Sequence, residues 1–198
     1  MRAATFLMSA TIVALSLPLS LLAENVDPDG KGYHWVYSEN GGWLDAEPGG
    51  NGGSAGLHTA DGLITGWLWS PNVGWISAHC SNTGSCGDVD YGLHLHVDSD
   101  NPGWLRFGGK AWSENTGWLV SHCLETDSCN EAQYGVRVEI ATGRVVGYAW
   151  SENLGWLSFS CNNTGSCGDS DFSIQFDPAM LAAWNANAIF KDGFESGP

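Results

Sequence analysis

Hydrophobic and polar residues alternate along most of the chain, in short runs that glycine and polar turns separate. After Trp118, for example, Val120 shares a face with Trp118, while Leu119 and Ser121 fall on the opposite face of an extended strand. Apolar residues at helical spacing are nearly absent. The pattern therefore predicts an all-β protein of short strands and tight turns.

The predicted strands recur as a repeat. The segment Trp69–Trp75 (WSPNVGW) matches Trp112–Trp118 (WSENTGW) and Trp150–Trp156 (WSENLGW), and a weaker copy, Tyr37–Trp43 (YSENGGW), precedes them. Asn and Gly tolerate positive φ, so the five residues between the two aromatic residues form a compact hairpin loop, and the two aromatic side chains pair across it. We expect an array of about four β-hairpin repeats.

These repeats lie near residues 33–56, 57–92, 93–134 and 135–176, within a β-repeat domain of residues 24–180. A single hairpin is barely stable alone, so the units have to stack to bury their apolar faces. A stacked sheet, a solenoid, a sandwich-like arrangement and a closed ring all satisfy this requirement.

Six cysteines occupy the same place in three of the repeats, each time as C-x5-C after the second tryptophan. Regularly placed, even-numbered cysteines in an exported chain indicate disulfides. The threefold repetition selects one pairing within each repeat, and each bond is expected to stabilise the fold by about 2 kcal/mol. The predicted disulfides are Cys80–Cys86, Cys123–Cys129 and Cys161–Cys167.

The two ends of the chain differ from the repeats. Residues 1–23 combine Arg2, an apolar stretch and a small residue, Ala23, which is the layout of a cleaved secretory signal; an uncleaved anchor is the alternative. No later segment is apolar enough to span a membrane. We expect residues 181–198 to form a C-terminal tail. Residues 177–184 are expected to form one short helical turn or a cap, and residues 185–198 to be loose.

The charge of the chain limits the classes of partner that it can bind. The formal net charge is −15, and loss of Arg2 with the signal makes the mature chain slightly more acidic. Such a charge repels phosphate backbones and anionic lipid headgroups, so nucleic acid is excluded as a partner. The charge favours cations, or it simply keeps an exported protein soluble.

Eleven tryptophans in 198 residues are the other unusual feature of the composition. Large rings are what small stacked hairpins have to bury, so we expect the repeated tryptophans mainly in the core. The period of two still leaves some rings outside, and a stacking platform for sugars remains the alternative. The tryptophans concerned are Trp69, Trp75, Trp112, Trp118, Trp150 and Trp156.

Histidines are the best candidates for metal ligands. His94 and His96 leave one face of a strand, and His58 occupies the position of His94 in the preceding repeat, so stacked repeats would bring three imidazoles together. His79 and His122 form a second candidate pair. Imidazoles without carboxylates suit copper or zinc; the simpler interpretation is that these are partly exposed strand residues.

Acidic residues gather in turns at 27–32, 88–90, 98–100 and 169–171, none with the spacing of a twelve-residue calcium loop, so we expect solvated turn acids. The string Gly52–Gly56 (GGSAG) matches G-x-S-x-G but lacks the preceding strand and following helix that a nucleophile elbow needs. No other catalytic motif is present. We therefore expect a protein that is not an enzyme.

The WSENxGW copies, and the stretch from Tyr134 to Trp150, resemble a family of exported bacterial repeat proteins with YAW-(S/G)-EN-x-GWI units. The resemblance covers roughly residues 35–176. The ending 189–195 (IFKDGFE) is similar to a tail of exported proteobacterial proteins. These resemblances imply secretion, a periplasmic location or surface display in a Gram-negative bacterium.

A second resemblance is to the surface-associated copper-binding proteins of methane-oxidising bacteria, whose site combines histidines with tryptophan as Trp-x-His. Here the equivalent positions carry Asp45, Ser77, Val120 and Ser158, so that site is not carried over. Two functions remain. The first is a non-enzymatic binding or structural module that engages a glycan or protein; the alternative is a copper-binding protein that uses histidines on adjacent repeats.

Overall fold

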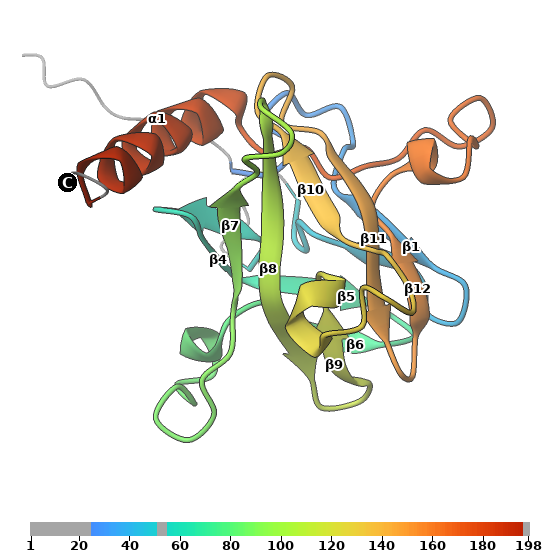
Figure 1. Cartoon of the computed structure of the whole chain (residues 1–198). Helices are drawn as coiled ribbons and strands as arrows, with labels where there is room; N and C mark the ends of the chain where they lie inside the picture. Colours follow the sequence, from blue (N-terminus) through green and yellow to red (C-terminus); the bar gives the residue numbers. More distant parts are fainter. Residues whose placement is uncertain (1–24, 51–54, 196–198) are drawn as a thin grey trace, which may run out of the picture.

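The computed structural model describes residues 25–50 and 55–195 (Figure 1). The predicted signal peptide, residues 1–23, and Gly52–Ser54 of the G-x-S-x-G string lie outside the described residues. The described part is mostly β structure with one α-helix, which confirms the predicted all-β class.

Each copy of the seven-residue motif forms a β-hairpin, as predicted. Its two aromatic residues are direct cross-strand partners in all four copies: Tyr37 with Trp43, Trp69 with Trp75, Trp112 with Trp118, and Trp150 with Trp156. The four hairpins are β1 (Trp35–Ser38) with β2 (Gly42–Asp45), β5 (Trp67–Ser70) with β6 (Gly74–Ser77), β8 (Trp104–Ser113) with β9 (Gly117–Val120), and β11 (Val145–Ser151) with β12 (Gly155–Ser158).

The hairpins close into an eight-stranded antiparallel barrel. Strand β2 pairs with β5, β6 with β8, β9 with β11, and β12 returns to β1. The register is the same at each junction, because the residue two places after the second tryptophan pairs with the first aromatic residue of the next hairpin. The four pairs are Asp45 with Trp69, Ser77 with Trp112, Val120 with Trp150, and Ser158 with Tyr37. Of the architectures left open by the sequence, the closed ring is the one formed.

The interior of the barrel holds aliphatic side chains, and the tryptophans lie outside. An eight-stranded barrel is only just wide enough for its own side chains, which favours small aliphatic residues over indoles. Trp69, Trp75, Trp118 and Trp156 are each 37–47% exposed, so the expectation that the repeated tryptophans are mainly core is wrong. Trp112 and Trp150 are half-buried on the same outer surface. The inward residues are Val36, Leu44, Leu68, Ile76, Ala111, Leu119, Ala149 and Leu157, all at most 2% exposed.

The Ser and Asn residues that recur in each copy of the motif join neighbouring hairpins at one end of the barrel. The Nδ2 atoms of Asn72, Asn115 and Asn153 each donate to a carbonyl in the preceding hairpin loop, at 3.3, 3.0 and 3.0 Å. The hydroxyl of Ser38 in the first loop donates to the carbonyl of Leu154 in the last, at 2.8 Å. The Ser and Asn positions therefore hold the ring of loops together.

Additional strands extend the barrel strands β8 and β11 into a second sheet. Its order is β3 (His58–Ala60), β4 (Leu63–Thr65), β7 (Leu93–Val97), β8, β10 (Val136–Glu139) and β11. Phe107 on β8 lies at the centre of the core beneath this sheet, with its ring centroid 6.4 Å from that of Phe159 and 6.3 Å from that of Phe176. The long strand β8 runs through both sheets (Figure 1).

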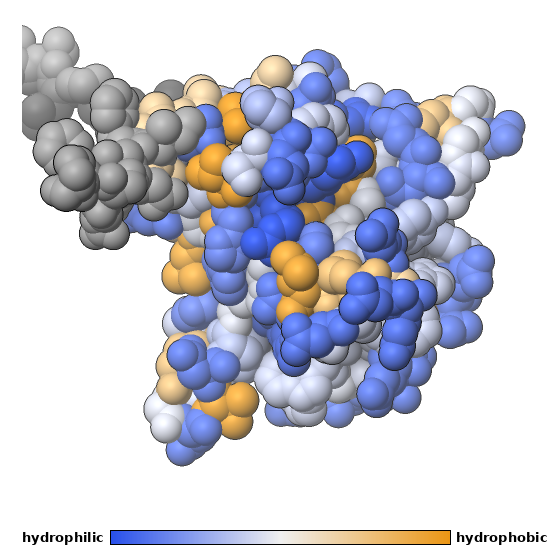
Figure 2. Space-filling view, in the orientation of Figure 1, coloured by the Kyte–Doolittle hydropathy of each residue, from blue (hydrophilic) through white to orange (hydrophobic). Residues whose placement is uncertain are grey.

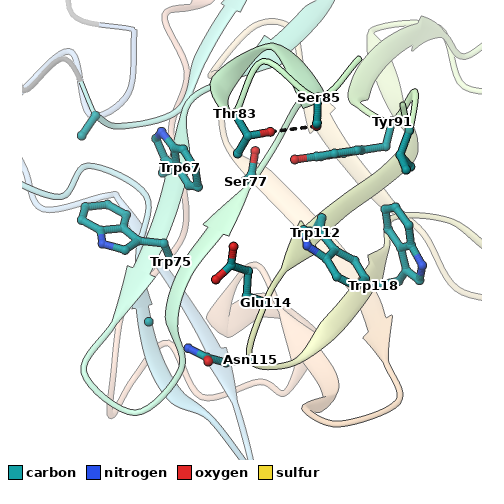
Figure 3. Close-up of a pocket in the computed structure, with 13 residues that line it drawn as sticks. Trp67, Trp75, Ser77, Thr83, Ser85, Tyr91, Trp112, Glu114, Asn115 and Trp118 are labelled. Carbon is teal, nitrogen blue, oxygen red and sulfur yellow. Dashed lines mark hydrogen bonds between the residues drawn. The ribbon is translucent and has the colours of Figure 1, made fainter. Parts of the chain in front are cut away.

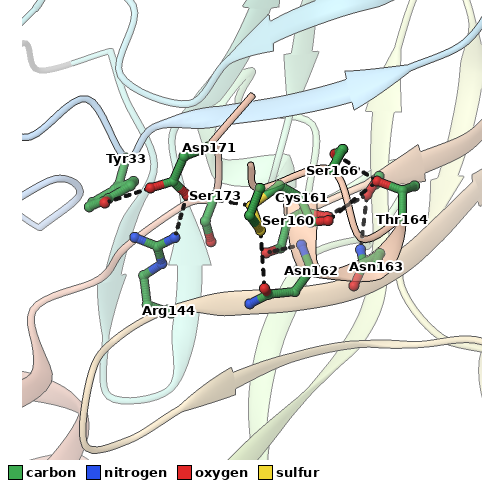
Figure 4. The surroundings of a disulfide bond; sticks show 12 residues. Tyr33, Arg144, Ser160, Cys161, Asn162, Asn163, Thr164, Ser166, Asp171 and Ser173 are labelled. Carbon is green, nitrogen blue, oxygen red and sulfur yellow. Dashed lines mark hydrogen bonds and ion pairs between the residues drawn. A yellow bond between two sulfur atoms is a disulfide. The ribbon is translucent and has the colours of Figure 1, made fainter. Parts of the chain in front are cut away.

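All three predicted disulfides are present, with Cα–Cα distances of 4.9 Å. Each closes a loop that begins with a short 3-10 helix: η1 (Cys80–Asn82), η2 (Cys123–Thr126) and η3 (Cys161–Asn163). Figure 4 shows the third loop, where Asp171 accepts hydrogen bonds from Tyr33 at 3.0 Å and from Arg144 at 3.1 Å. These contacts tie the last loop to the start of the described chain.

The C-terminal segment forms a helix, α1 (Pro178–Glu195), instead of the predicted loose tail. The Asp177 carboxylate accepts the backbone N–H of Ala179 at 2.8 Å, and proline at the first helical position needs no partner for its nitrogen. Leu181 is buried in the core, and Trp184 packs over Gly62. Among the described residues, no helix has the length and apolar character to cross a membrane.

Candidate functional site

A groove of about 860 Å³ opens on the outer surface between the second hairpin, β5–β6, and the third, β8–β9 (Figure 3). Trp67 and Trp75 form one wall, and Trp112, Trp118 and Tyr91 form the other. We call this the aromatic groove. Pockets of this size with mostly apolar walls and a few polar groups are typical of small-molecule sites.

The aromatic rings brace one another on each wall. The ring centroids of Trp67 and Trp75 lie 5.9 Å apart at 74°, and those of Tyr91 and Trp118 lie 5.6 Å apart at 75°. Edge-to-face contacts of this kind hold large rings in place. Trp75 and Trp118 still expose 47% and 39% of their surfaces, so the walls are preformed and accessible.

Polar groups lie between the two walls. The hydroxyls of Thr83 and Ser85 hydrogen-bond to each other at 2.8 Å, and Ser77 donates to the carbonyl of His79 at 2.9 Å. Figure 3 shows Glu114 between the Trp75 side and the Trp112 side. The groove therefore offers hydroxyls and one carboxylate among its indoles.

The hydroxyl of Tyr91 is the most informative of these groups. Its oxygen is buried and has no hydrogen-bond partner among the described residues. An unpaired buried hydroxyl costs about 1–3 kcal/mol. A ligand that supplied the missing hydrogen-bond partner would recover this cost.

The residues that line this junction differ from those at the other junctions of the barrel. The position of Trp67 is taken by Trp35 in the first hairpin, by Lys110 in the third and by Tyr148 in the fourth. The hydroxyl of Tyr148 already donates to the carbonyl of Asn163 at 3.1 Å. The groove thus combines four tryptophans of the second and third hairpins with Tyr91, where the next junction has a lysine. The alternative prediction of a stacking platform for sugars included Trp75, Trp112 and Trp118, but the repeat pattern alone did not indicate that Trp67 and Tyr91 complete a groove with them.

The structure brings two of the three candidate copper ligands together. The imidazoles of His94 and His96 on β7 lie 4.6 Å apart, and both Nε2 atoms point at the space above Gly108, where a Cβ would lie within 3.0 Å of each. His58 is on β3, and β4 separates that strand from β7. His58 therefore does not share their strand pair.

His79 and His122 have a structural role instead of a shared site. Each pairs with a glycine, Gly92 or Gly135, and not with the other histidine. Their Nδ1 atoms accept the backbone N–H groups of Ser81 and Leu124, at 3.0 and 3.2 Å, so both rings cap a 3-10 helix. In the fourth repeat Ser160 does the same at 3.2 Å.

Burial lowers the pKa values of two histidines. The pKa of His96 falls because of burial first, and then because of His94 and Arg106 nearby. Burial also lowers the pKa of His122, with Arg106 acting in the same direction. Both rings are therefore held neutral further below neutral pH than an exposed histidine.

A further group of potential metal ligands lies in the first repeat, which lacks a disulfide. Ligand atoms of Asp27, His34 and Glu47 all lie within 4.8 Å of one another. Asp27 is only 3% exposed, so the expectation of a solvated turn acid is wrong for this residue. Its two oxygens accept the backbone N–H groups of Lys31 and Gly32, at 2.9 and 2.7 Å. The Asp27 carboxylate thus already has partners that hold the turn.

Comparison with models of known protein families, with curated protein sequences and with solved structures finds no match for this chain.

Proposed function

We propose that this protein is an exported, non-enzymatic binding module, and that its aromatic groove binds a sugar unit of a glycan. The observation that carries the proposal is the pair of indole walls that face each other across several hydroxyls, of which that of Tyr91 is buried and has no partner among the described residues. Sugar rings present C–H faces that pack on indoles, and hydroxyls around their edges that need hydrogen-bond partners.

The way in which the groove is built supports binding over catalysis. Its polar groups are hydroxyls, one amide and the single carboxylate of Glu114. Glycoside hydrolysis usually needs two carboxyl groups that flank the bond to be cleaved. One acid among indoles instead suits an acceptor for a sugar hydroxyl.

The experiment is a glycan array with the mature, oxidised protein, followed by calorimetric titration of the best-binding neutral oligosaccharide. The variant is Trp75→Ala, which removes the outer of the two rings in one wall of the groove and leaves Trp67 in place. The matched control is Trp156→Ala, because Trp156 occupies the same repeat position, is 41% exposed and does not line the groove. Loss of this stacking ring is expected to weaken binding at least about tenfold.

Both substitutions expose similar surface and remove similar ring contacts, so their effects on folding are comparable. Weaker binding in Trp75→Ala with unchanged binding in Trp156→Ala supports the groove. Equal binding by both variants and the unchanged protein, or the absence of any glycan ligand on the array, contradicts the proposal.

Copper binding is the second candidate, and one observation favours it: the imidazoles of His94 and His96 converge above Gly108. The positive charge of Arg106, which lowers the pKa of His96, opposes a cation at this place. Elemental analysis after exposure to copper and desalting tests this candidate. Stoichiometric copper that is lost in His94→Ala/His96→Ala supports it, and an unloaded protein refutes it.

A further inference from the structure

Two arginines and a histidine stand in one row across the second sheet. On β7, β8 and β10, His96 lies directly opposite Arg106, and Arg106 lies directly opposite Arg137. Directly opposed side chains on neighbouring antiparallel strands are about 5 Å apart at their Cβ atoms, and like charges at this distance destabilise a sheet. We call these three residues the cationic row.

The row stands out because the chain as a whole is strongly acidic, with 22 acids against seven lysines and arginines. Lys31 and Arg144 each form an ion pair, with Asp29 and Asp171. Arg106 and Arg137 form no ion pair with any residue in the described part of the chain. In a protein with this excess of acids, two arginines placed side by side without a carboxylate partner need another explanation.

The contacts of the two guanidinium groups leave them available. Arg137 is exposed and stacks over the ring of Trp104, with 4.8 Å from Cζ to the ring centroid. Arg106 makes only a long contact, 3.5 Å, to the carbonyl of Phe107. In Figure 2 the surface over β10 and the upper part of β8 is hydrophilic.

The acids nearest to the row are engaged elsewhere or lie at a longer range. Glu139 faces Trp104 across the strand pair and accepts a hydrogen bond from Thr142, while Glu125 and Asp98 act on the neighbouring histidines only over a distance. None of the three is within ion-pair distance of Arg106 or Arg137 in the described structure. The positive charge of the row is thus reduced but not neutralised.

We propose that the cationic row is an anion-binding site that takes a single oxyanion group, a carboxylate or a sulfate, separately from the aromatic groove. Two adjacent guanidinium groups present parallel N–H donors that match the geometry of such groups. The neutral imidazole of His96 adds a further N–H donor at the end of the row. A dense polyanion is repelled by the acidic remainder of the protein, so an isolated charge fits better.

The experiment is calorimetric titration of the mature, oxidised protein at low ionic strength with two probes, sodium sulfate and the single-carboxylate sugar methyl galacturonoside. Binding of sulfate assigns the free ion as a ligand, and binding of the methyl galacturonoside alone assigns a sugar-borne carboxylate. In either case Arg106→Gln and Arg137→Gln are each expected to weaken binding at least about tenfold. Added sodium chloride is expected to weaken it further.

The matched control is Arg144→Gln, because this arginine is already held by Asp171 and by the ring of Tyr33. It is expected to leave anion binding unchanged. Arg106→Gln and Arg137→Gln are expected to keep or raise the unfolding temperature, because each removes a like-charge pair, so loss of binding is not loss of fold.

Arg106→Gln is also expected to leave neutral-glycan binding in the aromatic groove unchanged, so the failure of one proposal is distinguishable from the failure of the other. The anion site is refuted if neither probe binds, if both arginine variants bind like the unchanged protein, or if Arg144→Gln weakens binding as strongly.

Discussion

Phe172 packs edge-on against Trp43, with the ring centroids 4.9 Å apart at 84°. Phe172 follows the last disulfide loop, and Trp43 belongs to the first hairpin, so this contact joins the end of the repeat array to its beginning. The same contact recurs between Tyr91 and Trp118 at 5.6 Å, and between Tyr134 and Trp156 at 5.2 Å. Each of the three disulfide-bearing repeats thus places an aromatic residue on the next hairpin, and the last of them places its own on the first hairpin.

Removal of this closing contact is expected to destabilise the whole barrel. Phe172 is 6% exposed, so Phe172→Ala should lower the free energy of unfolding by about 3–5 kcal/mol. Urea denaturation of the oxidised protein measures the change. Leu124→Ala is the control, because Leu124 is 55% exposed and a surface substitution should cost less than about 0.5 kcal/mol. A loss below about 1 kcal/mol in Phe172→Ala would show that the ring does not depend on this contact.

Two glycines with similar backbone angles are expected to respond differently to alanine. Gly147 has φ +95°, and a Cβ there would lie 2.0 Å from the carbonyl oxygen of Gly135, whereas Gly165 has φ +70° and open space around it. Gly165→Ala should cost about 1 kcal/mol for the left-handed backbone alone. Gly147→Ala should cost about 3 kcal/mol or more, because the strands have to separate as well.

Thermal and urea unfolding of both glycine variants measure this difference. Equal decreases in the free energy of unfolding would show that the close approach of β11 to Gly135 adds nothing to the cost of the substitution. Gly66 and Gly109 have the same crowded relation to Gly56 and Gly92, at 1.9 Å in both cases, so Gly66→Ala serves as an independent repetition.

Mild acid is expected to weaken the fold through His96 and His122. The pKa of each is lowered in the folded state, so the unfolded chain binds more protons below the ordinary histidine pKa of about 6.5. The contribution of the two neutral histidines to the free energy of unfolding is complete above that pH, and it is lost as the pH falls through their lowered folded-state pKa values. The free energy of unfolding should therefore decrease on acidification from neutral pH.

The double variant His96→Asn/His122→Ser tests this origin, because Ser160 shows that serine can provide the same cap in another repeat. Its free energy of unfolding should vary less with pH over this range than that of the unchanged protein. His58→Asn, on the exposed strand β3, is the control. An identical pH dependence in the double variant would place the acid sensitivity in other groups.

Much of the fold could be predicted because the repeat presents the same evidence several times. The spacing of Cys161 and Cys167 means little alone, but two further copies of it fix the disulfides. The closure of the ring was not predictable, because the pairing of Ser158 with Tyr37 depends on the twist accumulated over four hairpins and on no local signal.

The position of the tryptophans shows what alternation leaves open. A period of two separates Trp67 and Trp69 from Leu68, but it does not say which face is inside. Because the interior of the barrel is narrow, the leucine points inward and the tryptophans point outward. A short helical turn was expected at Asp177-Pro178, which is a helix start signal, but the full length of α1 was not, because the apolar residues that follow have weak helical periodicity.

The candidate site was less predictable than the fold. Trp67 and Trp112 come from different strands, Tyr91 comes from the segment before β7, and the three meet only because the second hairpin lies beside the third in the closed barrel. The sequence showed only that Trp67 has the same residue type as Trp35 in the first copy and is replaced by Lys110 and Tyr148 in later copies. The pairing of Arg106 with Arg137 also depends on strand order, which the sequence does not state.

The most direct test of the aromatic groove is the affinity of Tyr91→Phe for the oligosaccharide found on the array, measured by calorimetry beside Tyr148→Phe. The Tyr148 hydroxyl is bonded to Asn163, so Tyr148→Phe should lose about 1 kcal/mol of stability and bind the glycan normally. Tyr91→Phe should keep its stability and bind at least about fivefold more weakly, because its hydroxyl has no partner until the ligand arrives. Unchanged affinity in Tyr91→Phe would contradict the account of the groove as the glycan site.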